Sequence, residues 1–163
     1  MTSRHSVDTV TRSVDLPPRQ IGKLGELLVQ YKLLEHGIES AHLTTDAGVD
    51  LVAYHSSGRR AFTIQVKTNL RPKPAGGKGK PALDWWVPED CPAKLVAFVD
   101  VSGRRVWLIT SKELPRIAQQ NASGRLHFYM YTNPEFATSP HHKAARTADF
   151  DKFLLERRIT KFF

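Results

Sequence analysis

The stretch from Gly48 to Thr68 constrains this chain most, because it predicts a β-hairpin. Two runs of alternating apolar residues flank Ser57-Gly58, a dipeptide typical of two-residue hairpin turns. With that turn, each step back along one strand matches a step forward along the other. The predicted register therefore places Asp50 opposite Gln65.

The two faces of this hairpin differ in chemistry, because side chains alternate along a strand with period two. Gln65 and Lys67 share the face of Asp50, so a carboxylate, an amide and an ammonium lie side by side. The opposite face is apolar and carries Leu51, Ala53, Phe62, Ile64 and Val66. A turn longer by one residue would shift Val66 opposite Asp50, so the polar cluster depends on this register.

The charge balance favours a polyanionic partner, since 24 Lys+Arg against 16 Asp+Glu give a net charge of +8. No acidic residue occurs between Asp50 and Asp84. A solvated basic loop would show the same pattern. The run begins on the hairpin with the polar cluster, so we predict phosphate-backbone contacts on either side of Lys67. The residues predicted to make them are Arg59, Arg60, Arg71, Lys73, Lys78 and Lys80.

The length of 163 residues predicts one domain, which we expect to span 17–163 after a flexible arm at 1–16. Hydrophobic content of 40% and charged content of 25% are typical of a soluble fold. Neither a membrane-spanning run nor a signal peptide is evident, so we expect a cytoplasmic protein without membrane contact. Cys91 is the single cysteine, which excludes an intramolecular disulfide and favours a packing role.

The order of helix and strand signals predicts an α+β (α/β) fold, a sheet with helices packed against it. Leucines at helical spacing between Pro17-Pro18 and Gly37 predict the first helix. A proline- and glycine-rich basic loop is predicted over 71–80. The other predicted elements are strands at 38–44, 50–54, 61–68, 95–101, 106–109 and 126–131, a short helix at 111–119, and a closing helix from residue 150.

The polar face of the hairpin offers what a metal-dependent phosphodiesterase needs. Asp50 has the hard oxygens that Mg²⁺ prefers, and Mg²⁺ binds one or two carboxylates while keeping several waters. The Gln65 carbonyl oxygen is a weaker ligand than a carboxylate. Lys67 places positive charge where water would attack and where charge develops on the phosphate.

Glu26 is the best candidate for a further acid. It lies on a helical stripe with Gly22, Val29 and Leu33, and the small Gly22 and Gly25 would permit close approach to the sheet. A second apolar stripe runs along the same predicted helix. We therefore expect a helix buried on more than one side, with the acid pointing inward.

Glu26 on the helix, Asp50 opening one strand and Gln65-Val66-Lys67 on the next resemble the restriction-endonuclease-like PD-(D/E)XK nuclease superfamily, in a Gln-x-Lys variant. The match covers about 22–68 and extends more loosely to Ile109. Val49 stands where the motif has its Pro, and Gln65 where it usually has Glu. The resemblance implies an αβββαβ core with a mixed central sheet flanked by helices.

The resemblance also implies roles for the site residues. Asp50 would be the central metal ligand, Gln65 a second ligand, Glu26 an outer ligand, and Lys67 the residue that orients or activates water. The implied function is a DNA endonuclease that hydrolyses phosphodiester bonds with Mg²⁺, for which Mn²⁺ can substitute. One such domain cuts one strand, so double-strand cleavage implies a homodimer or higher homo-oligomer.

Two other functions stay open at this point. A non-catalytic nucleic-acid-binding protein could retain the fold and the basic surface without a metal. An enzyme acting on small phosphorylated substrates is disfavoured by the long basic run. Plasmid cleavage with a divalent metal separates the first alternative from the nuclease.

Other residues admit more than one reading. Trp85-Trp86 could stack on exposed bases or belong to the core or a subunit contact. His127 and His141-His142 are expected in polar loops rather than at a metal, because acidic or cysteine partners at ligand spacing are lacking. Near the C-terminus, Arg157, Arg158 and Lys161 could bind phosphate or satisfy a helix dipole.

Overall fold

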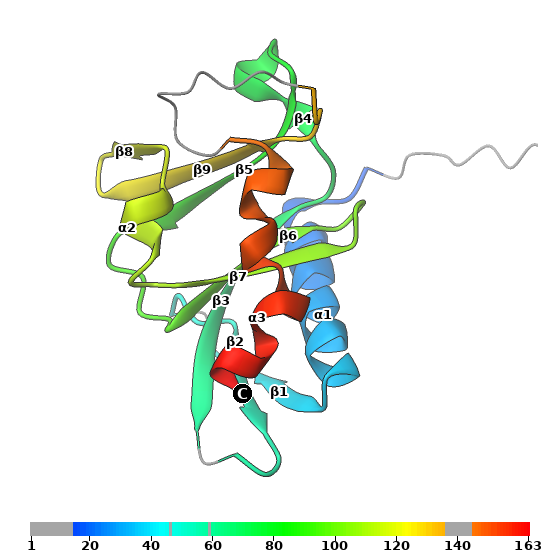
Figure 1. Ribbon diagram of the computed structural model, residues 1–163, viewed down its shortest axis with the longest axis vertical. Coiled ribbons are helices and arrows are strands. Elements are labelled where there is room, and N and C mark those ends of the chain that lie inside the picture. The colour runs from blue at the N-terminus through cyan, green and yellow to red at the C-terminus, as the bar shows by residue number, and fades with distance from the viewer. Residues whose placement is uncertain (1–14, 46, 59, 136–144) are drawn as a thin grey trace, which may run out of the picture.

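The computed structural model describes residues 15–45, 47–58, 60–135 and 145–163, and Figure 1 shows how their elements are arranged. Most of the predicted N-terminal arm, residues 1–14, lies outside these ranges. The chain opens with α1 (Pro18–Glu35), where Pro17 and Pro18 begin the helix and the left-handed Gly37 follows its end. The predicted first helix is confirmed.

A mixed five-stranded sheet forms the centre of the molecule, in the order β1-β2-β3-β6-β7. β3 pairs parallel with β6, and the other neighbours pair antiparallel. This confirms the predicted fold class, a mixed α+β sheet flanked by helices. The strands are β1 (Ile38–His42), β2 (Leu51–His55), β3 (Ala61–Asn69), β6 (Leu95–Asp100) and β7 (Arg105–Thr110).

The β2–β3 hairpin has the predicted register, which runs from Leu51 opposite Ile64 to Tyr54 opposite Ala61. The predicted two-residue turn is wrong, because β2 ends at His55 and β3 begins only at Ala61. The Gly58 N–H donates to the His55 carbonyl at 2.8 Å, which closes a turn inside a longer connection. The longer loop keeps the same alignment of the two strands.

A second, four-stranded sheet, in the order β4-β5-β9-β8, is the main feature that the sequence pattern does not predict. Only β9 (Arg125–Tyr131) matches a predicted strand. The expected loop contains β4 (Lys73–Pro74) and the 3₁₀ turn η1 (Ala75–Gly77), and β5 (Pro81–Pro88) follows. These elements occupy the crossover between β3 and β6. The αβββαβ core that the resemblance implies has a helix at this place. The edge strand β8 is Gln120–Ala122.

The molecule is layered, with α1 (Pro18–Glu35) and α3 (Leu155–Phe162) on one face of the five-stranded sheet and the second sheet on the other (Figure 1). Two cores fill the spaces between these layers. The core between the sheets is rich in aromatic rings, and Trp85 stacks on Phe98 with centroids 4.8 Å apart. The core on the helix side includes Val29 and Leu33 of α1 together with Ile64 of β3.

Helix α1 is buried along one stripe, so the expectation of a helix buried on more than one side is wrong. Gly25, Val29 and Leu33 face the sheet. The second apolar stripe is largely exposed, because the sheet covers only one side of the helix. Its exposed members are Leu24, Leu27, Tyr31 and Leu34, with exposed fractions of 37 to 61%.

Gly25 is where α1 approaches β3 most closely. A Cβ atom here would lie 1.9 Å from Oγ1 of Thr68 and 2.8 Å from its Cβ, which no side-chain rotation relieves. We expect Gly25→Ala to lower the free energy of unfolding by about 2 kcal/mol through overpacking. The matched control is Gly22→Ala on the same helix, where a Cβ meets nothing within 4 Å.

Gly22→Ala should leave stability unchanged or raise it by about 0.5 to 1 kcal/mol through helix propensity. Urea unfolding of both variants measures the difference. Equal effects of the two substitutions would contradict the close helix–sheet contact at Gly25. The prediction that both glycines permit close approach holds at Gly25 and is wrong at Gly22.

The C-terminal segment contributes to both cores, with Phe150 and Phe153 in the core between the sheets and Leu155 and Ile159 in the core on the helix side. It contains η2 (Thr147–Phe153) and α3 (Leu155–Phe162), so the predicted closing helix is interrupted at Leu154. The predicted short helix is reduced to α2 (Leu114–Ile117). None of the helices in the described ranges is long and apolar enough to cross a membrane.

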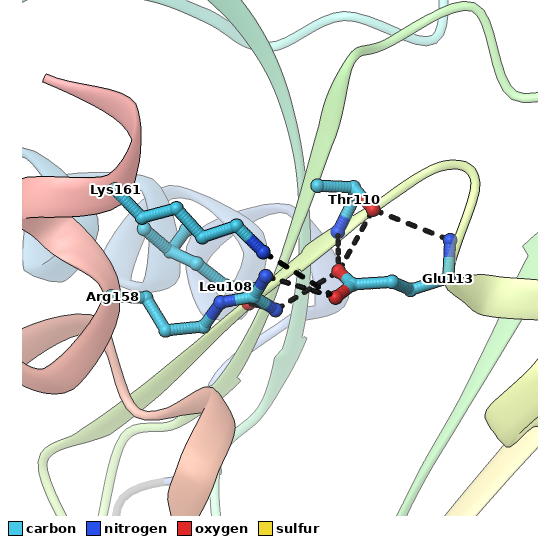
Figure 2. A network of polar contacts seen from close by, with 5 residues as sticks. All are labelled: Leu108, Thr110, Glu113, Arg158 and Lys161. Atoms are coloured by element: carbon cyan, nitrogen blue, oxygen red, sulfur yellow. Dashed lines mark hydrogen bonds and ion pairs between the residues drawn. The ribbon is translucent and has the colours of Figure 1, made fainter.

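Arg158 of α3 is a buried structural residue, with 6% of its surface exposed. Figure 2 shows its guanidinium against Glu113, which precedes α2. Its two terminal nitrogens each donate to a Glu113 carboxylate oxygen at 2.9 Å, and one also donates to the Leu108 carbonyl at 3.0 Å. Lys161 approaches the same carboxylate at 4.0 Å. The network joins α3 to β7 and accounts for Arg158 without a phosphate ligand.

Candidate functional site

Asp50 is held beside Gln65 by two contacts to β3. Its N–H donates to the Ile64 carbonyl at 2.9 Å, and its carboxylate accepts the Val66 N–H at 2.6 Å. These partners are the residues before and after Gln65. The left-handed Gly48, at φ +79°, turns the chain into β2 two residues earlier, and a Cβ there would lie 3.1 Å from Pro92.

Gln65 points into a nearly closed environment, with only 6% of its surface exposed. Cys91, from the connection between β5 and β6, donates its thiol hydrogen to Gln65 Oε1 at 3.4 Å. Burial raises the pKa of this thiol, the charge of Lys67 lowers it and that of Asp50 raises it further. Asp50, Gln65 and Lys67 therefore gather around one residue, Cys91.

The sequence pattern predicts a packing role for Cys91. It does not predict that the thiol lies against Gln65. The thiol reaches Gln65 because Pro92 lies against Gly48 and brings the β5–β6 connection onto the hairpin. In the sequence, only Gly48 indicates such a contact, because a residue without a side chain leaves room for another segment to approach.

Lys67 is half-buried and lines a cleft of about 410 Å³ beside the start of α1. Pro18 and Gly22 form the helical wall, and Arg71 and Lys73 extend the opposite wall. Within the described ranges, no carboxylate lies within ion-pair distance of the Lys67 ammonium. Asp15 also lines the cleft, so its charge is net positive, with Lys67, Arg71 and Lys73 against one carboxylate. Lys67 can therefore meet an anion that enters it.

Glu26 occupies a different position from that of the hairpin cluster. Its carboxylate pairs with Lys23 and lies 3.2 Å from Nδ1 of His42 at the end of β1. Among the described residues, its hydrogen bonds and ion pairs all go to these two side chains. His42 pairs with Leu51, the residue after Asp50, so Glu26 lies at the same end of the sheet as Asp50.

The predicted phosphate contacts do not form one continuous patch. Arg60 precedes β3 and Arg71 follows it, and the nine residues of the strand separate them by about 30 Å. Lys73, Lys78 and Lys80 are exposed around β4 and η1, at the Arg71 end. Arg59 lies outside the described residues.

The tryptophan pair divides between the two sides of the second sheet. Trp85 is buried in the core, whereas Trp86 lies on the outer face and stacks on His127. The expectation of a loop at His127 is wrong, because the residue lies on β9. His141-His142 fall outside the described residues.

Metal-binding potential is limited to a small set of oxygen donors. In the part of the chain that the structure describes, no three His, Cys, Asp or Glu side chains cluster to hold a metal. The site has one carboxylate, that of Asp50, with the Gln65 amide oxygen beside it. This set is too small to enclose a cation without water and substrate oxygens.

No family model matches the chain, and no curated protein matches its sequence. Among solved structures, the bacterial homing endonuclease I-Ssp6803I aligns with a TM-score of 0.59 at 10% identity, over 88% of this chain and 92% of that one. A Holliday junction resolvase, Hjc of Archaeoglobus fulgidus, aligns with a TM-score of 0.46 at 15% identity, over 66% of this chain and 82% of its own. MepB gives 0.33 at 10% identity, over 71% and 84%.

At these identities the likeness shows the fold alone. The first of these alignments covers nearly all of both chains. The chain therefore shares its overall fold with this homing endonuclease, in agreement with the predicted mixed α+β sheet flanked by helices.

Proposed function

We propose that this protein is a metal-dependent DNA endonuclease whose site is built from Asp50, Gln65 and Lys67. The observation that carries the proposal is the hairpin geometry. The Asp50 carboxylate is fixed by the Val66 N–H beside Gln65, and Lys67 on the same strand opens into a basic cleft. The similarity in fold to a homing endonuclease supports a nuclease chemistry for this cluster.

The donor set fits Mg²⁺, with Mn²⁺ as a substitute. Mg²⁺ takes oxygen ligands, keeps several waters, and in phosphate-processing sites binds through one or two carboxylates and the substrate. Asp50 would hold it with the Gln65 carbonyl oxygen, and Glu26 would act as an outer ligand through water. When bound, the ion would supply Lewis acidity and positive charge at the scissile phosphate.

The protein residues would provide orientation and charge. The Lys67 ammonium would hold the attacking water and stabilise negative charge developing on the phosphate. The Cys91 thiol donates to the Gln65 amide oxygen and would help to fix the orientation of that side chain. The predicted basic residues would bind flanking phosphates without reading sequence, and the spread from Arg60 to Arg71 would suit an extended duplex.

Cleavage of both strands would require a second copy of the chain, because one such site cuts one strand. The exposed stripe on α1 supplies apolar surface that a homodimer could cover.

A plasmid assay tests the proposal against a non-catalytic nucleic-acid-binding protein of the same fold. Supercoiled plasmid incubated with the protein and Mg²⁺ or Mn²⁺ should be converted to open-circular or linear forms. EDTA should stop the conversion. Binding to the plasmid without any conversion in either metal would favour the non-catalytic alternative, for which the small ligand set is the supporting observation.

A further inference from the structure

The outer face of the second sheet carries a continuous row of aromatic rings. Alternation along β9 points His127, Tyr129 and Tyr131 away from the core, and Trp86 of β5 lies opposite His127. Trp86 and His127 stack with centroids 4.1 Å apart and planes 4° from parallel. The next two steps of the row, from His127 to Tyr129 and from Tyr129 to Tyr131, are each 5.6 Å.

These rings are not needed for the core, which the alternate residues of the same strands fill. Leu126, Phe128 and Met130 of β9 are at most 2% exposed, whereas the outward residues between them are only half-buried. The row therefore presents aromatic surface to solvent.

A hollow of about 460 Å³ lies over the row, within the size range of small-ligand sites. His127, Tyr129 and Tyr131 line it, and Lys73 of β4 lies on its rim. Asp84 is the acid that lines it, and this carboxylate lies 3.3 Å from Nε2 of His127. The hollow thus combines flat aromatic surface with polar groups and one cation.

Lys73 also lines the cleft beside Lys67, so β4 is a wall shared by the two depressions. The exposed Lys78 and Lys80 follow β4 and add positive charge near the same rim. Asn69, at the end of β3, donates to the Asp84 carbonyl at 2.6 Å and ties the two sheets together here. A polynucleotide strand in the Lys67 cleft would reach the aromatic hollow by passing over β4.

We propose that this hollow binds unpaired nucleotides of single-stranded DNA, with bases stacked on Tyr129 and Tyr131 and phosphates near Lys73. Bases inside a duplex have both faces covered by their neighbours, so only an unstacked base offers a face to these rings. The continuity with the Lys67 cleft rests on the proposed endonuclease function, whereas the binding itself needs no cleavage.

The test is fluorescence anisotropy with a labelled oligothymidylate and a labelled duplex, in EDTA so that cleavage plays no part. Tyr129→Ala and Tyr131→Ala should each weaken oligothymidylate binding by about tenfold, the effect of losing one stacking partner. Duplex affinity should change less than about twofold, because duplex contacts depend on the basic cleft. Tyr129→Phe and Tyr131→Phe should bind like wild type, because the ring is retained.

The matched control is Tyr54→Ala, which removes a tyrosine 46% exposed on β2 of the other sheet. It should leave both affinities unchanged. Unaltered oligothymidylate binding in both β9 alanine variants would overturn the proposal, as would equal losses for duplex and single strand.

A second measurement uses the wild-type protein alone and covers the case in which the alanine variants fail to fold. An abasic oligonucleotide of the same length keeps the phosphates and lacks the bases. We expect it to bind about tenfold or more weakly than oligothymidylate. Equal affinity of the two oligonucleotides would overturn base stacking, whatever the outcome for cleavage.

Discussion

Lys67→Met should lower the rate of plasmid cleavage by about 10²- to 10³-fold, the effect of removing one preorganised stabiliser of transition-state charge. Methionine keeps much of the side-chain length and apolar stem and removes the ammonium. Since Lys67 has no ion-pair partner among the described residues, its loss should leave the fold intact. The rates come from single-turnover nicking in Mg²⁺ with protein in excess.

The matched control is Lys112→Met, which removes an exposed lysine that follows β7. Its cleavage rate should remain within about twofold of wild type, because one distant surface charge contributes little steering at moderate salt. Thermal denaturation of both variants checks the fold. A folded Lys67→Met protein that cleaves at the wild-type rate would contradict the role of this ammonium.

Glu113→Gln should lower the free energy of unfolding by about 2 to 3 kcal/mol. The substitution leaves the guanidinium of Arg158 buried and without a carboxylate, and uncompensated charges of this kind are costly. The estimate lies below the range for fully buried pairs, because 28% of the Glu113 side chain is exposed. Urea denaturation at pH 7 measures the change.

The control for this prediction is the double variant Glu113→Gln with Arg158→Met. Removing both charges should recover part of the lost stability, since a well-packed apolar residue replaces a buried ion that has no partner. If the two side chains are directly coupled, the double variant should be more stable than the summed losses of the two single variants predict. A double variant less stable than that sum would contradict the coupling.

The same pair gives a pH dependence. Burial raises the pKa of the Glu113 carboxyl, but hydrogen bonds from Arg158 and Thr110 outweigh it and hold the pKa at about 2, below the ordinary value of 4.5. A carboxyl with a depressed pKa in the folded state contributes its stability fully above 4.5. That contribution should be lost as the pH falls from 4.5 toward 2, and Glu113→Gln should lack this part of the acid sensitivity.

Much of the candidate site follows from local rules. The register of the β2–β3 hairpin was predicted correctly although the two-residue turn was not, because the alternation of apolar and polar residues fixes which of them share a face. The close contact at Gly25 was predictable for a related reason, since a glycine on the sheet-facing stripe leaves space for Thr68. The hairpin register depends on residues near one another in sequence. At Gly25 only the need for space is local, because Thr68 lies more than forty residues later.

The parts that the sequence did not predict depend on distant segments. β5 pairs with β9, which lies some forty residues later, and Trp85 alone of the tryptophan pair reaches the core. The spacing of apolar residues within β5 does not show which other segment of the chain packs against the strand. Cys91 likewise meets Gln65 through a loop that tertiary packing brings onto the hairpin.

Glu26 illustrates the remaining difficulty. Its place on the sheet-facing side of α1 follows from helical spacing, yet its partners are set by a neighbouring turn of helix and by β1. Lys23 lies one turn away, and His42 arrives from the edge strand. Sequence spacing alone could not distinguish these partners from Asp50.

The central claim is that the Asp50 cluster cleaves DNA with a divalent metal, and plasmid nicking by wild type and Asp50→Asn tests it most directly. The two proteins are purified in parallel and assayed with Mg²⁺, Mn²⁺ or EDTA. We predict metal-dependent nicking by wild type, and none above the EDTA background by Asp50→Asn, which keeps the side-chain shape without the charge. Equal nicking by both proteins would contradict the account.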